Sequence, residues 1–330
     1  MRGYITRRVL LFFPTVFLAT FILFVMLRLI PGDVIDLMLA EFDDYNTTEE
    51  AVLRERLLET MGMDVPMHIQ YGRWVGILPQ KSGEFSGVLE GNLGDSLWKH
   101  EPVTSIIFER LPVTFELGIL ALSLGWLIAL PVGIMSAIRQ DTIFDYGSRS
   151  LAIMFVAAPG FWLATMVVVY PAIYWGWSPP TNYIPFIENP AGNLVQFVIP
   201  AILMGLAMSG GIARFGRTMM LEVLRQDYIR TAWAKGLSER TVIMRHALKN
   251  AIIPLVTILG MELPMLIAGS VIMEQIFCLP GVGRIFLEAL STRDYPVVSG
   301  VNMFLITVVL LSNLVVDTFY GYLDPRIRYD

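Results

Sequence analysis

Charged residues occupy two places in this sequence where an otherwise apolar chain would not be expected to hold them. The stretch TAWAKGLSERTVIMRH, from Thr231 to His246, lies between two strongly apolar regions and carries three Lys or Arg residues. Glu262 and Glu274 lie inside a single apolar run. A charge in hydrocarbon costs roughly 2.5–3.5 kcal/mol on insertion scales, so it usually faces a partner or a water-filled path. The first place is suited to binding a protein partner, and the second to holding a proton or attracting a cation.

The sequence contains no motif for binding ATP or for catalysis. A phosphate-binding loop GxxxxGK[ST] needs a lysine directly after a glycine, and none of the four lysines follows one. The motifs HExxH and GxSxG are also missing. With one cysteine and three histidines, neither a thiolate cluster nor a histidine-rich metal site is expected. We therefore predict no catalytic residue, metal or cofactor in this chain, and a driving force that comes either from an ion gradient or from another subunit.

The composition indicates a membrane protein. Hydrophobic residues make up 55% and charged residues 16% of the chain, and the mean hydropathy is +0.60. Crossing about 30 Å of hydrocarbon takes roughly 20 apolar residues in a helix. We therefore predict an all-α membrane protein with six transmembrane helices, the first of them uncleaved. They fall at residues 9–27 and at about 111–138, 151–174, 194–211, 251–277 and 297–320. Kinks are expected at the prolines inside these spans, Pro131, Pro159, Pro200 and Pro264.

Lysine and arginine predict the orientation of these helices. Fifteen of them lie at the two termini, in the loop 139–150 and in the segment 212–250. Nine lie on the opposite side, mainly in one long loop where the positive-inside rule has little force. We therefore expect both termini and the segment 212–250 to be cytoplasmic, in a chain that crosses the cytoplasmic or inner membrane several times.

The chain divides into three predicted regions. Residues 1–30 hold the N-terminus and the first transmembrane helix, residues 31–110 form an external acidic helical segment, and residues 111–330 form the membrane core. The external segment has fifteen acidic residues against six basic ones, which favours a folded cap over a linker.

Two stretches of the external segment have helical spacing. VLRERLLETMG is one of them, and IQYGRWVGIL is the other. The second places Tyr71, Trp74 and Ile77 on one face, as in an amphipathic helix that lies at a membrane surface.

The stretch around Gly236 predicts two helices that meet at a sharp corner. Residues 228–235 favour a helix, and Gly236 suits the left-handed position that ends one. Ser238 is a suitable N-cap for the next helix, and Glu239 favours the positive end of that helix. A charged corner that is too short to enter lipid is typical of a docking element. A basic loop needed only for membrane topology has the same composition.

The stretch QDYIRTAWAKGLSERTVIMRHALKNAIIP resembles the cytoplasmic signature of binding-protein-dependent ABC permeases. It is similar to the peptide and nickel branch of that family, with its pattern RTAxAKGL…RHxLxNAxIP. Further segments, in the same order along nearly the whole chain, resemble the first of the two permeases of that branch. They are LRLIPGD, QYGRWV, GNLGDSL, RLPVTFELG, PGFWLATMVV, FCLPGVGR, RDYPVVSGV and LDPRIRY. The resemblance implies the MetI-like fold of type I ABC importer permeases, with a helical cap between the first two transmembrane helices.

The resemblance also implies partners. These are a second homologous permease, two cytoplasmic ABC ATPases that bind ATP and magnesium, and an external substrate-binding protein, all at a lipid bilayer and without nucleic acid. In that family the helical corner inserts into a groove of the ATPase. The wider superfamily often has Glu where Arg230 stands, so a mechanism that rests on that carboxylate is not expected here. The predicted coupling residues are Arg230, Thr231, Ala232, Lys235, Gly236, Leu237, Ser238, Glu239 and Arg240.

Four residues of the fifth predicted transmembrane helix are candidates for the substrate path. Glu262 lies near its middle, where the family more often has a neutral amide, and we expect it to favour a cationic group such as a peptide amino terminus. The alternative is a protonated Glu262 that hydrogen-bonds another helix. Met261 and Met265 provide an adaptable lining, or else packing. Glu274, near the external end, is a further path candidate, with capping or interfacial pairing as the alternative.

We predict the permease subunit of an ABC importer for di- and oligopeptides, which is not itself an enzyme. The alternative is an ion-coupled secondary transporter that uses Glu262 and Glu274, although no inverted repeat is visible. A membrane scaffold or sensor would not need two carboxylates in one span. Nickel chelates, glutathione and oligosaccharides stay open as substrates, because selection in this branch rests largely with the binding protein.

Overall fold

The computed structural model describes residues 2–29, 35, 39, 47–60 and 62–323, and these residues are helical or irregular, without a strand. The chain divides into two compact units. The first unit comprises Met1–Val9, Pro112–Arg284 and Val309–Asp330, and the second comprises Leu10–Leu111 and Ile285–Val308. Each unit is described by itself.

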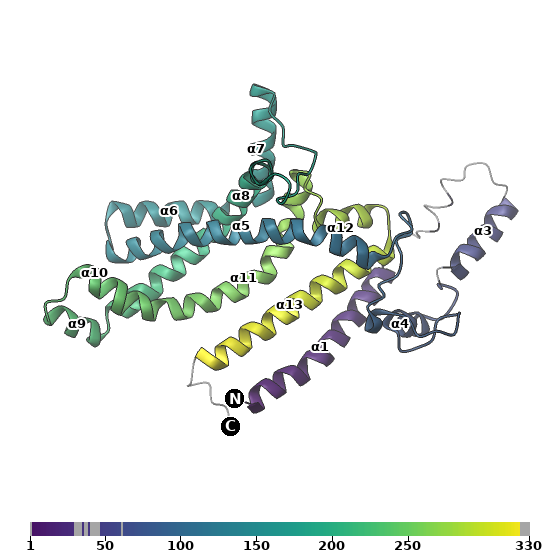
Figure 1. The fold of residues 1–330 in the computed structure, drawn as a ribbon, viewed down its shortest axis with the longest axis horizontal. Coiled ribbons are helices and arrows are strands. Elements are labelled where there is room, and N and C mark those ends of the chain that lie inside the picture. The colour runs from purple at the N-terminus through teal and green to yellow at the C-terminus, as the bar shows by residue number, and fades with distance from the viewer. Residues whose placement is uncertain (1, 30–34, 36–38, 40–46, 61, 324–330) are drawn as a thin grey trace. The chain divides into compact units, whose positions relative to one another are not determined.

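The helices follow one another in the order labelled in Figure 1. They are α1 (Arg2–Leu29), α3 (Thr47–Thr60), α4 (Met67–Val75), η1 (Val88–Glu90), α5 (Val103–Ile138), α6 (Ile143–Ala157), α7 (Gly160–Trp175), α8 (Pro190–Leu224), α9 (Asp227–Ala234), α10 (Glu239–Thr241), η2 (Val242–Ala247), α11 (Leu248–Ile276), α12 (Val282–Ser291) and α13 (Tyr295–Leu323).

Four helices in the described part of the chain are long and apolar enough to cross a membrane. Their qualifying segments are Thr6–Leu29 in α1, Val103–Ile138 in α5, Pro190–Leu224 in α8 and Tyr295–Val316 in α13. The pair α6 and α7 qualifies only when its two helices are taken together, which brings the number to five. The chain is therefore an all-helical protein with several potential membrane spans. The count of six, which includes α11, stays a prediction.

The third predicted transmembrane helix is broken. Residues Ala158 and Pro159 separate α6 from α7, and the two helices are bent by 88°. Proline disfavours the α conformation in the residue before it, and Ala158 is extended, with ψ of 124°. The helix continues through the other three prolines for which kinks were predicted, which are Pro131, Pro200 and Pro264.

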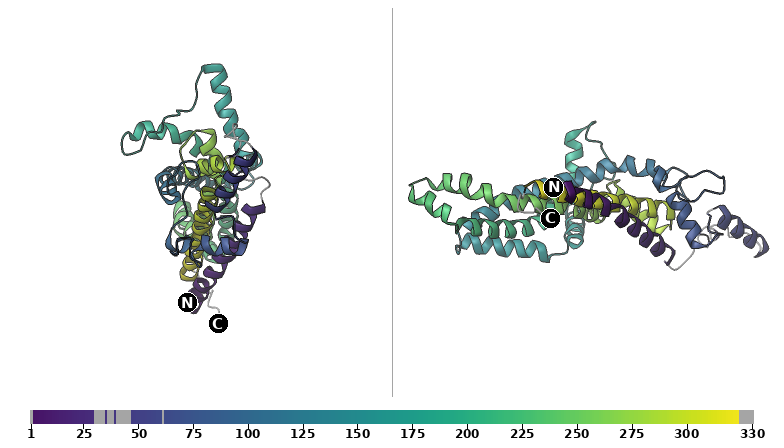
Figure 2. Two further views of the ribbon diagram at one scale, coloured as in Figure 1. Left: turned by 90° about the vertical axis from the view of Figure 1, so that its right-hand side faces the viewer. Right: turned by 90° about the horizontal axis from the view of Figure 1, so that it is seen from below.

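In the first unit, α8 packs along both α6 and α11. Small residues bring α5 close to α8: a Cβ added to Gly125 would lie 3.0 Å from the carbonyl oxygen of Gly205, and one added to Gly133 would lie 2.7 Å from that of Ala213. Small residues allow membrane helices to approach closely. In Figure 1 and in the left view of Figure 2, α7 extends away from α5 and α6.

In the second unit, α4 packs against α1 through aromatic side chains. The ring of Tyr71 makes edge contacts with Phe17, Phe21 and Phe24. Its hydroxyl oxygen lies 3.0 Å from Thr20 Oγ1. The aromatic face that was predicted to lie at a membrane surface is therefore occupied by α1.

The helix α4 also ends earlier than predicted. Gly76 has φ of 95° and its N–H bonds the carbonyl groups of Gly72 and Arg73, which stops the helix. Ile77, predicted on the same helical face as Tyr71 and Trp74, lies beyond this stop and is 54% exposed. The prediction for Ile77 was therefore wrong, because a left-handed glycine ends the periodic face.

Candidate functional site

The corner predicted around Gly236 is present in the first unit. Gly236 has φ of 75° directly after α9 and its C-cap. The N–H of Gly236 donates to the carbonyl of Trp233 at 2.9 Å, and that of Leu237 donates to the carbonyl of Ala232 at 3.4 Å. These two bonds form the Schellman motif, in which a glycine takes the left-handed position without steric cost. The glycine thus turns the chain sharply between α9 and α10.

The inner face of the corner is anchored to the ends of long helices. Ile229 and Ala232 of α9 are 1% and 5% exposed and belong to one buried cluster. Ala137 of α5, Met220 of α8 and Ala251 of α11 belong to the same cluster. Because protein interiors are close-packed and transmit strain, a displacement of α9 would reach α5, α8 and α11 through these contacts.

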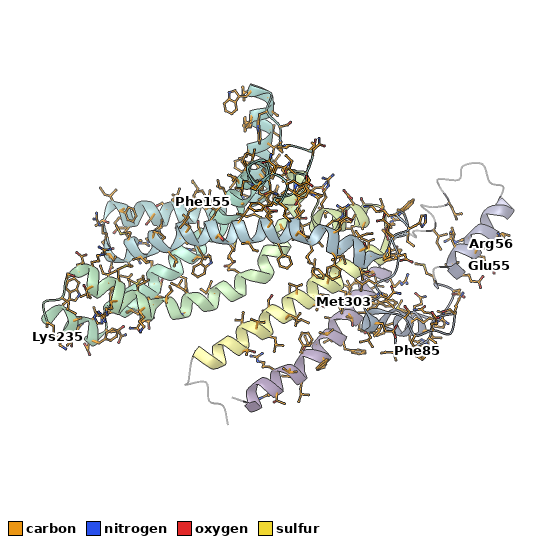
Figure 3. The ribbon with its side chains drawn as sticks, viewed as in Figure 1. Glu55, Arg56, Phe85, Phe155, Lys235 and Met303 are labelled. Atoms are coloured by element: carbon orange, nitrogen blue, oxygen red, sulfur yellow. The ribbon has the colours of Figure 1, made fainter. Side chains whose placement is uncertain are left out.

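The outer face of the corner is exposed, and we call residues Trp233–Arg240 the corner surface. Every residue in this range is exposed, including Trp233 at 46% and Leu237 at 36%, and Lys235 lies at its tip (Figure 3). Aromatic residues and arginine are enriched at the energetic centres of protein interfaces. Arg230 and Thr231 are also exposed, whereas Ala232, although predicted as a coupling residue, is buried beneath the surface.

Two polar residues of the corner make contacts that were not predicted. Ser238 stands at the N-cap of α10, but its side chain makes no capping hydrogen bond to a backbone N–H. Its hydroxyl instead lies 2.9 Å from Thr241 Oγ1. Arg230 Nη1 lies 3.4 Å from Asp227 Oδ1 in an ion pair whose side chains are 75% and 95% exposed. Such a pair is worth little in water, so the guanidinium stays accessible to a partner.

The second helix of the corner is not a regular α-helix from its start. α10 is one short turn, and it continues into the π-helix η2 before α11 begins. Single π turns are frequent at functional sites. Asn250 Nδ2 donates to the hydroxyl of Tyr228 at 2.9 Å, which ties α9 to the first turn of α11.

A buried ion pair near the corner was missed by sequence reasoning. Asp145 of α6 is fully buried and accepts two hydrogen bonds from Arg217 of α8, from Nε at 2.8 Å and from Nη2 at 2.7 Å. Its other donors are the hydroxyl of Ser136 in α5 and the N–H of Asp141. These bonds hold α5, α6 and α8 together. Nothing in the local sequence distinguishes Asp145 from a solvated loop residue, because its partner Arg217 is 72 positions away.

The carboxylate of Glu262 lies partly buried within α11. None of the described residues donates a hydrogen bond or forms an ion pair with it. Met261 and Met265 lie on the same helix, but their side chains fall outside the described part of the structure. The geometry therefore places Glu262 within a predicted span. Among the described side chains, no group of three or more His, Cys, Asp or Glu residues is arranged to hold a metal ion.

Glu274 is enclosed rather than open to a path in this conformation. Its side chain is 0% exposed, and its carboxylate accepts from Thr114 Oγ1 at 2.8 Å and from the N–H of Arg284 at 3.0 Å. The Thr114 hydroxyl in turn accepts from the N–H of Val282 at 2.9 Å. Gly281 is required here, because a Cβ at that position would overlap the carboxyl group of Glu274. Glu274 thus fixes the FCLPGVGR segment against α5, with the geometry of a helix cap.

Two family models match the chain. Residues 129–329 match the model described as "Binding-protein-dependent transport system inner membrane component". Residues 1–118 match the N-terminal model of a membrane component of such systems.

Similarity to curated proteins extends over the full length. A Brucella abortus (strain 2308) protein, provisionally named as a peptide transport system permease, is 38% identical over 330 residues, with 100% of both chains covered. The di/tripeptide transport system permease protein DppB of Pseudomonas aeruginosa (strain UCBPP-PA14) is 35% identical, with 100% of this chain and 99% of that protein covered. The oligopeptide transport system permease protein AppB of Bacillus subtilis (strain 168) is 34% identical, with 100% of both covered.

Two solved structures share the fold at low sequence identity. One is an amino acid ABC transporter, with a TM-score of 0.53 and 14% identity over 66% of this chain and 94% of that chain. The other is the methionine ABC transporter MetNI in an inward-facing conformation, with a TM-score of 0.50 and 17% identity over 68% of this chain and 99% of that chain. The fold is therefore similar to that of type I ABC importer permeases.

Proposed function

Because the chain belongs to the family of inner membrane components of binding-protein-dependent transport systems, we propose that it forms half of the translocation path of an importer for di- and oligopeptides. Family membership makes it a membrane permease subunit that acts with a binding protein and an ATPase. Peptides are supported as cargo by the full-length similarity to DppB and AppB, whose names assign them to peptide systems. A second homologous permease supplies the other half of the path, and two ATPases supply the energy.

The observation that carries the proposal is the two-sided construction of the corner. Its outer surface, Trp233–Arg240, is exposed, while Ile229 and Ala232 on its inner side are packed against α5, α8 and α11. An ATPase that binds the outer surface can therefore move α5, α8 and α11 together. This chain transmits the movement from the corner to its long helices, and ATP hydrolysis takes place in the partner. Arg230, Thr231 and the corner surface make the contact, and Ala232 supports it from beneath.

The substrate path in this proposal runs past Glu262, with Met261 and Met265 as its adaptable lining. A partly buried carboxylate that has no described partner is suited to attract the amino terminus of a peptide. Glu274 contributes at one end of the same helix by fixing the FCLPGVGR segment, as its hydrogen bonds to Thr114 and Arg284 support.

The proposed topology has six transmembrane helices and both termini in the cytoplasm. The excess of lysine and arginine at the termini and in residues 212–250 supports this orientation. Residues 1–30 then hold the first span, residues 31–110 form an external cap, and residues 111–330 form the core.

Transport by the reconstituted complex tests this function. The chain is purified with its co-expressed partner subunits, placed in proteoliposomes with the binding protein, and supplied with a labelled dipeptide. We expect uptake that requires both ATP and the binding protein. Leu237→Asp, on the corner surface, should abolish uptake and ATPase binding. Met244→Asp, at a residue that is 55% exposed outside that surface, should retain both.

Two results would contradict the proposal. Uptake driven by a proton gradient in the absence of ATP would favour the secondary transporter. Competition of dipeptide uptake by an oligosaccharide, but not by other peptides, would reject peptides as the cargo class.

A further inference from the structure

Three sequence motifs that the transport proposal leaves unused line one cavity in the second unit. QYGRWV contributes Gln70, Arg73 and Trp74, GNLGDSL contributes residues 92–97, and RDYPVVSGV contributes Tyr295 and other residues near it. The cavity has a volume of about 770 Å³. Small-molecule sites typically occupy roughly 300–1,000 Å³, so the cavity is large enough to hold a ligand.

The walls of this cavity are fixed by hydrogen bonds. Asp294 is 3% exposed and accepts from the hydroxyl of Ser96 at 2.6 Å and from the N–H of Leu97 at 3.2 Å. The indole N–H of Trp98 donates to the carbonyl of Thr292 at 3.0 Å. These bonds join residues 96–98 to the residues that directly precede α13. The cavity is therefore preformed, and a ligand would not have to order its walls.

Polar groups without partners point to an anionic ligand. Arg73 Nε and Trp74 Nε1 are buried N–H donors that find no acceptor among the described residues. Arg73 also forms no salt bridge with any of those residues. Buried donors of this kind are rare in native proteins and call for an explanation. Arg73 has no hydrogen-bonded or ion-paired anion among the described residues, and an occupant that brings phosphate or carboxylate oxygens would supply one to its guanidinium group.

Nearby acidic groups do not cancel this preference. Glu59, which also lines the cavity, lies 3.6 Å from Lys81, whose ammonium group is 2.9 Å from Asp64 as well. The positive charge of Lys81 therefore offsets part of the negative charge of Glu59 and Asp64. Asp95 is the other acidic residue of the lining, and it is exposed.

The remaining lining suits an apolar tail at the depth of lipid headgroups. Phe24 and Leu27 lie at the C-terminal end of the potential span in α1, and Tyr295 lies at the N-terminal end of that in α13. The guanidinium carbon of Arg28 lies 5.3 Å from the ring centre of Phe24 and 5.9 Å from that of Tyr295. Aromatic and basic residues are enriched where spans leave the hydrocarbon. Most of the cavity surface is apolar.

We propose that this cavity binds an anionic phospholipid. The phosphate group accepts hydrogen bonds from the terminal N–H groups of Arg73, and the first part of an acyl chain lies against Phe24 and Leu27. The bound lipid then becomes part of the wall between α1, α4 and α13 in the second unit. Free phosphate and the carboxylate of a peptide share part of this chemistry, and the experiment separates them from a lipid.

Lipid binding to the purified, complete transporter tests the assignment. The probes are phosphatidylglycerol, phosphatidylcholine, inorganic phosphate and the dipeptide Ala-Phe, and binding is followed by native mass spectrometry and by the shift in the thermal unfolding midpoint. We expect wild-type protein to retain phosphatidylglycerol and not phosphatidylcholine. Arg73→Gln should weaken phosphatidylglycerol binding roughly ten- to hundredfold, as expected for the loss of a hydrogen bond to a charged group. The control Lys99→Gln removes an exposed charge outside the lining and should leave binding unchanged.

A second variant keeps the test decisive if Arg73→Gln fails to fold. Arg73→Lys keeps the positive charge, removes the planar pair of N–H donors, and should weaken binding several-fold. Equal losses in Arg73→Gln and Lys99→Gln would overturn the proposal, because they would show general attraction of the lipid to surface charge. Retention of inorganic phosphate or of the dipeptide in place of the lipid, with the same dependence on Arg73, would also overturn it.

Discussion

Three acidic side chains in the first unit show different ways of placing a carboxylate away from water. Asp145 is compensated by a two-bond contact with Arg217, and Glu274 is held by donors from Thr114 and Arg284. Glu262 has no such contact with the described residues. A carboxylate that already accepts hydrogen bonds from protein donors gains little further interaction energy from a nearby cation. A buried carboxylate without such donors gains much more. This contrast is why Glu262 is the residue whose substitution should change cargo preference.

Glu262→Gln should affect cationic and neutral cargo differently. Removing the charge while keeping the shape should raise KM for lysine-containing dipeptides about tenfold, or about 1.4 kcal/mol. KM for N-acetylated dipeptides without lysine, which carry no cationic group, should change less than about twofold. Uptake kinetics in proteoliposomes measure both values. Equal changes in KM for the two classes of cargo would show that Glu262 does not distinguish cationic from neutral cargo.

Arg217→Met should destabilise the protein strongly. Asp145 would remain buried without its cation, and breaking a buried pair by removing one partner costs about 3–5 kcal/mol. Thermal unfolding of the detergent-solubilised protein measures the effect. Arg230→Met is the matched control, because the Arg230–Asp227 pair is exposed and such pairs are worth about 0–1 kcal/mol. Similar losses in the two variants would contradict the role given to the buried pair.

At the scale of elements, the corner depends on one backbone position. Gly236 combines φ of 75° with open space around the place where a Cβ would be. A larger residue there would meet no clash, so the cost of a substitution comes from backbone conformation alone. The left-handed conformation costs an L-residue about 1–2 kcal/mol.

Gly236→Ala should therefore weaken coupling more than it weakens folding. We expect roughly a tenfold loss in the affinity of the chain for its ATPase and a matching fall in transport, because part of the population would leave the corner conformation. Binding of the purified ATPase to the solubilised permease measures this loss. Gly147→Ala in α6 is the control, since Gly147 has no positive φ and also lies in open space. Unchanged ATPase affinity in Gly236→Ala would remove the corner as the point of contact.

At the scale of the whole molecule, the break between α6 and α7 bears on the number of spans. If the pair crosses the membrane once, four spans precede Lys235 (α1, α5, the α6 and α7 pair, and α8), so Lys235 and the N-terminus lie on the same side. We expect a cysteine placed at Lys235 to react with an impermeant thiol reagent only from the cytoplasm, and one placed at Lys99 only from outside. Both variants are made in a background with Cys278→Ser. Labelling of both positions from one side would contradict the six-span topology.

From the sequence alone we could predict the apolar helices, the family resemblance and the corner. These features depend on local patterns: runs of apolar residues, a glycine at a left-handed position, and a motif with fixed spacing. The break at Pro159 was likewise expected as a kink, because proline acts on its own neighbours. A local pattern could not give the angle of 88°.

Contacts between side chains that are far apart in the sequence could be identified only from the folded chain. Asp145 and Arg217, Glu274 and Thr114, and Ser96 and Asp294 are 72, 160 and 198 positions apart. The burial of Ala232 beneath the corner and of Tyr71 against α1 likewise depends on which helix packs there. Helix packing brings distant residues into contact, and no periodicity in the sequence specifies those partners.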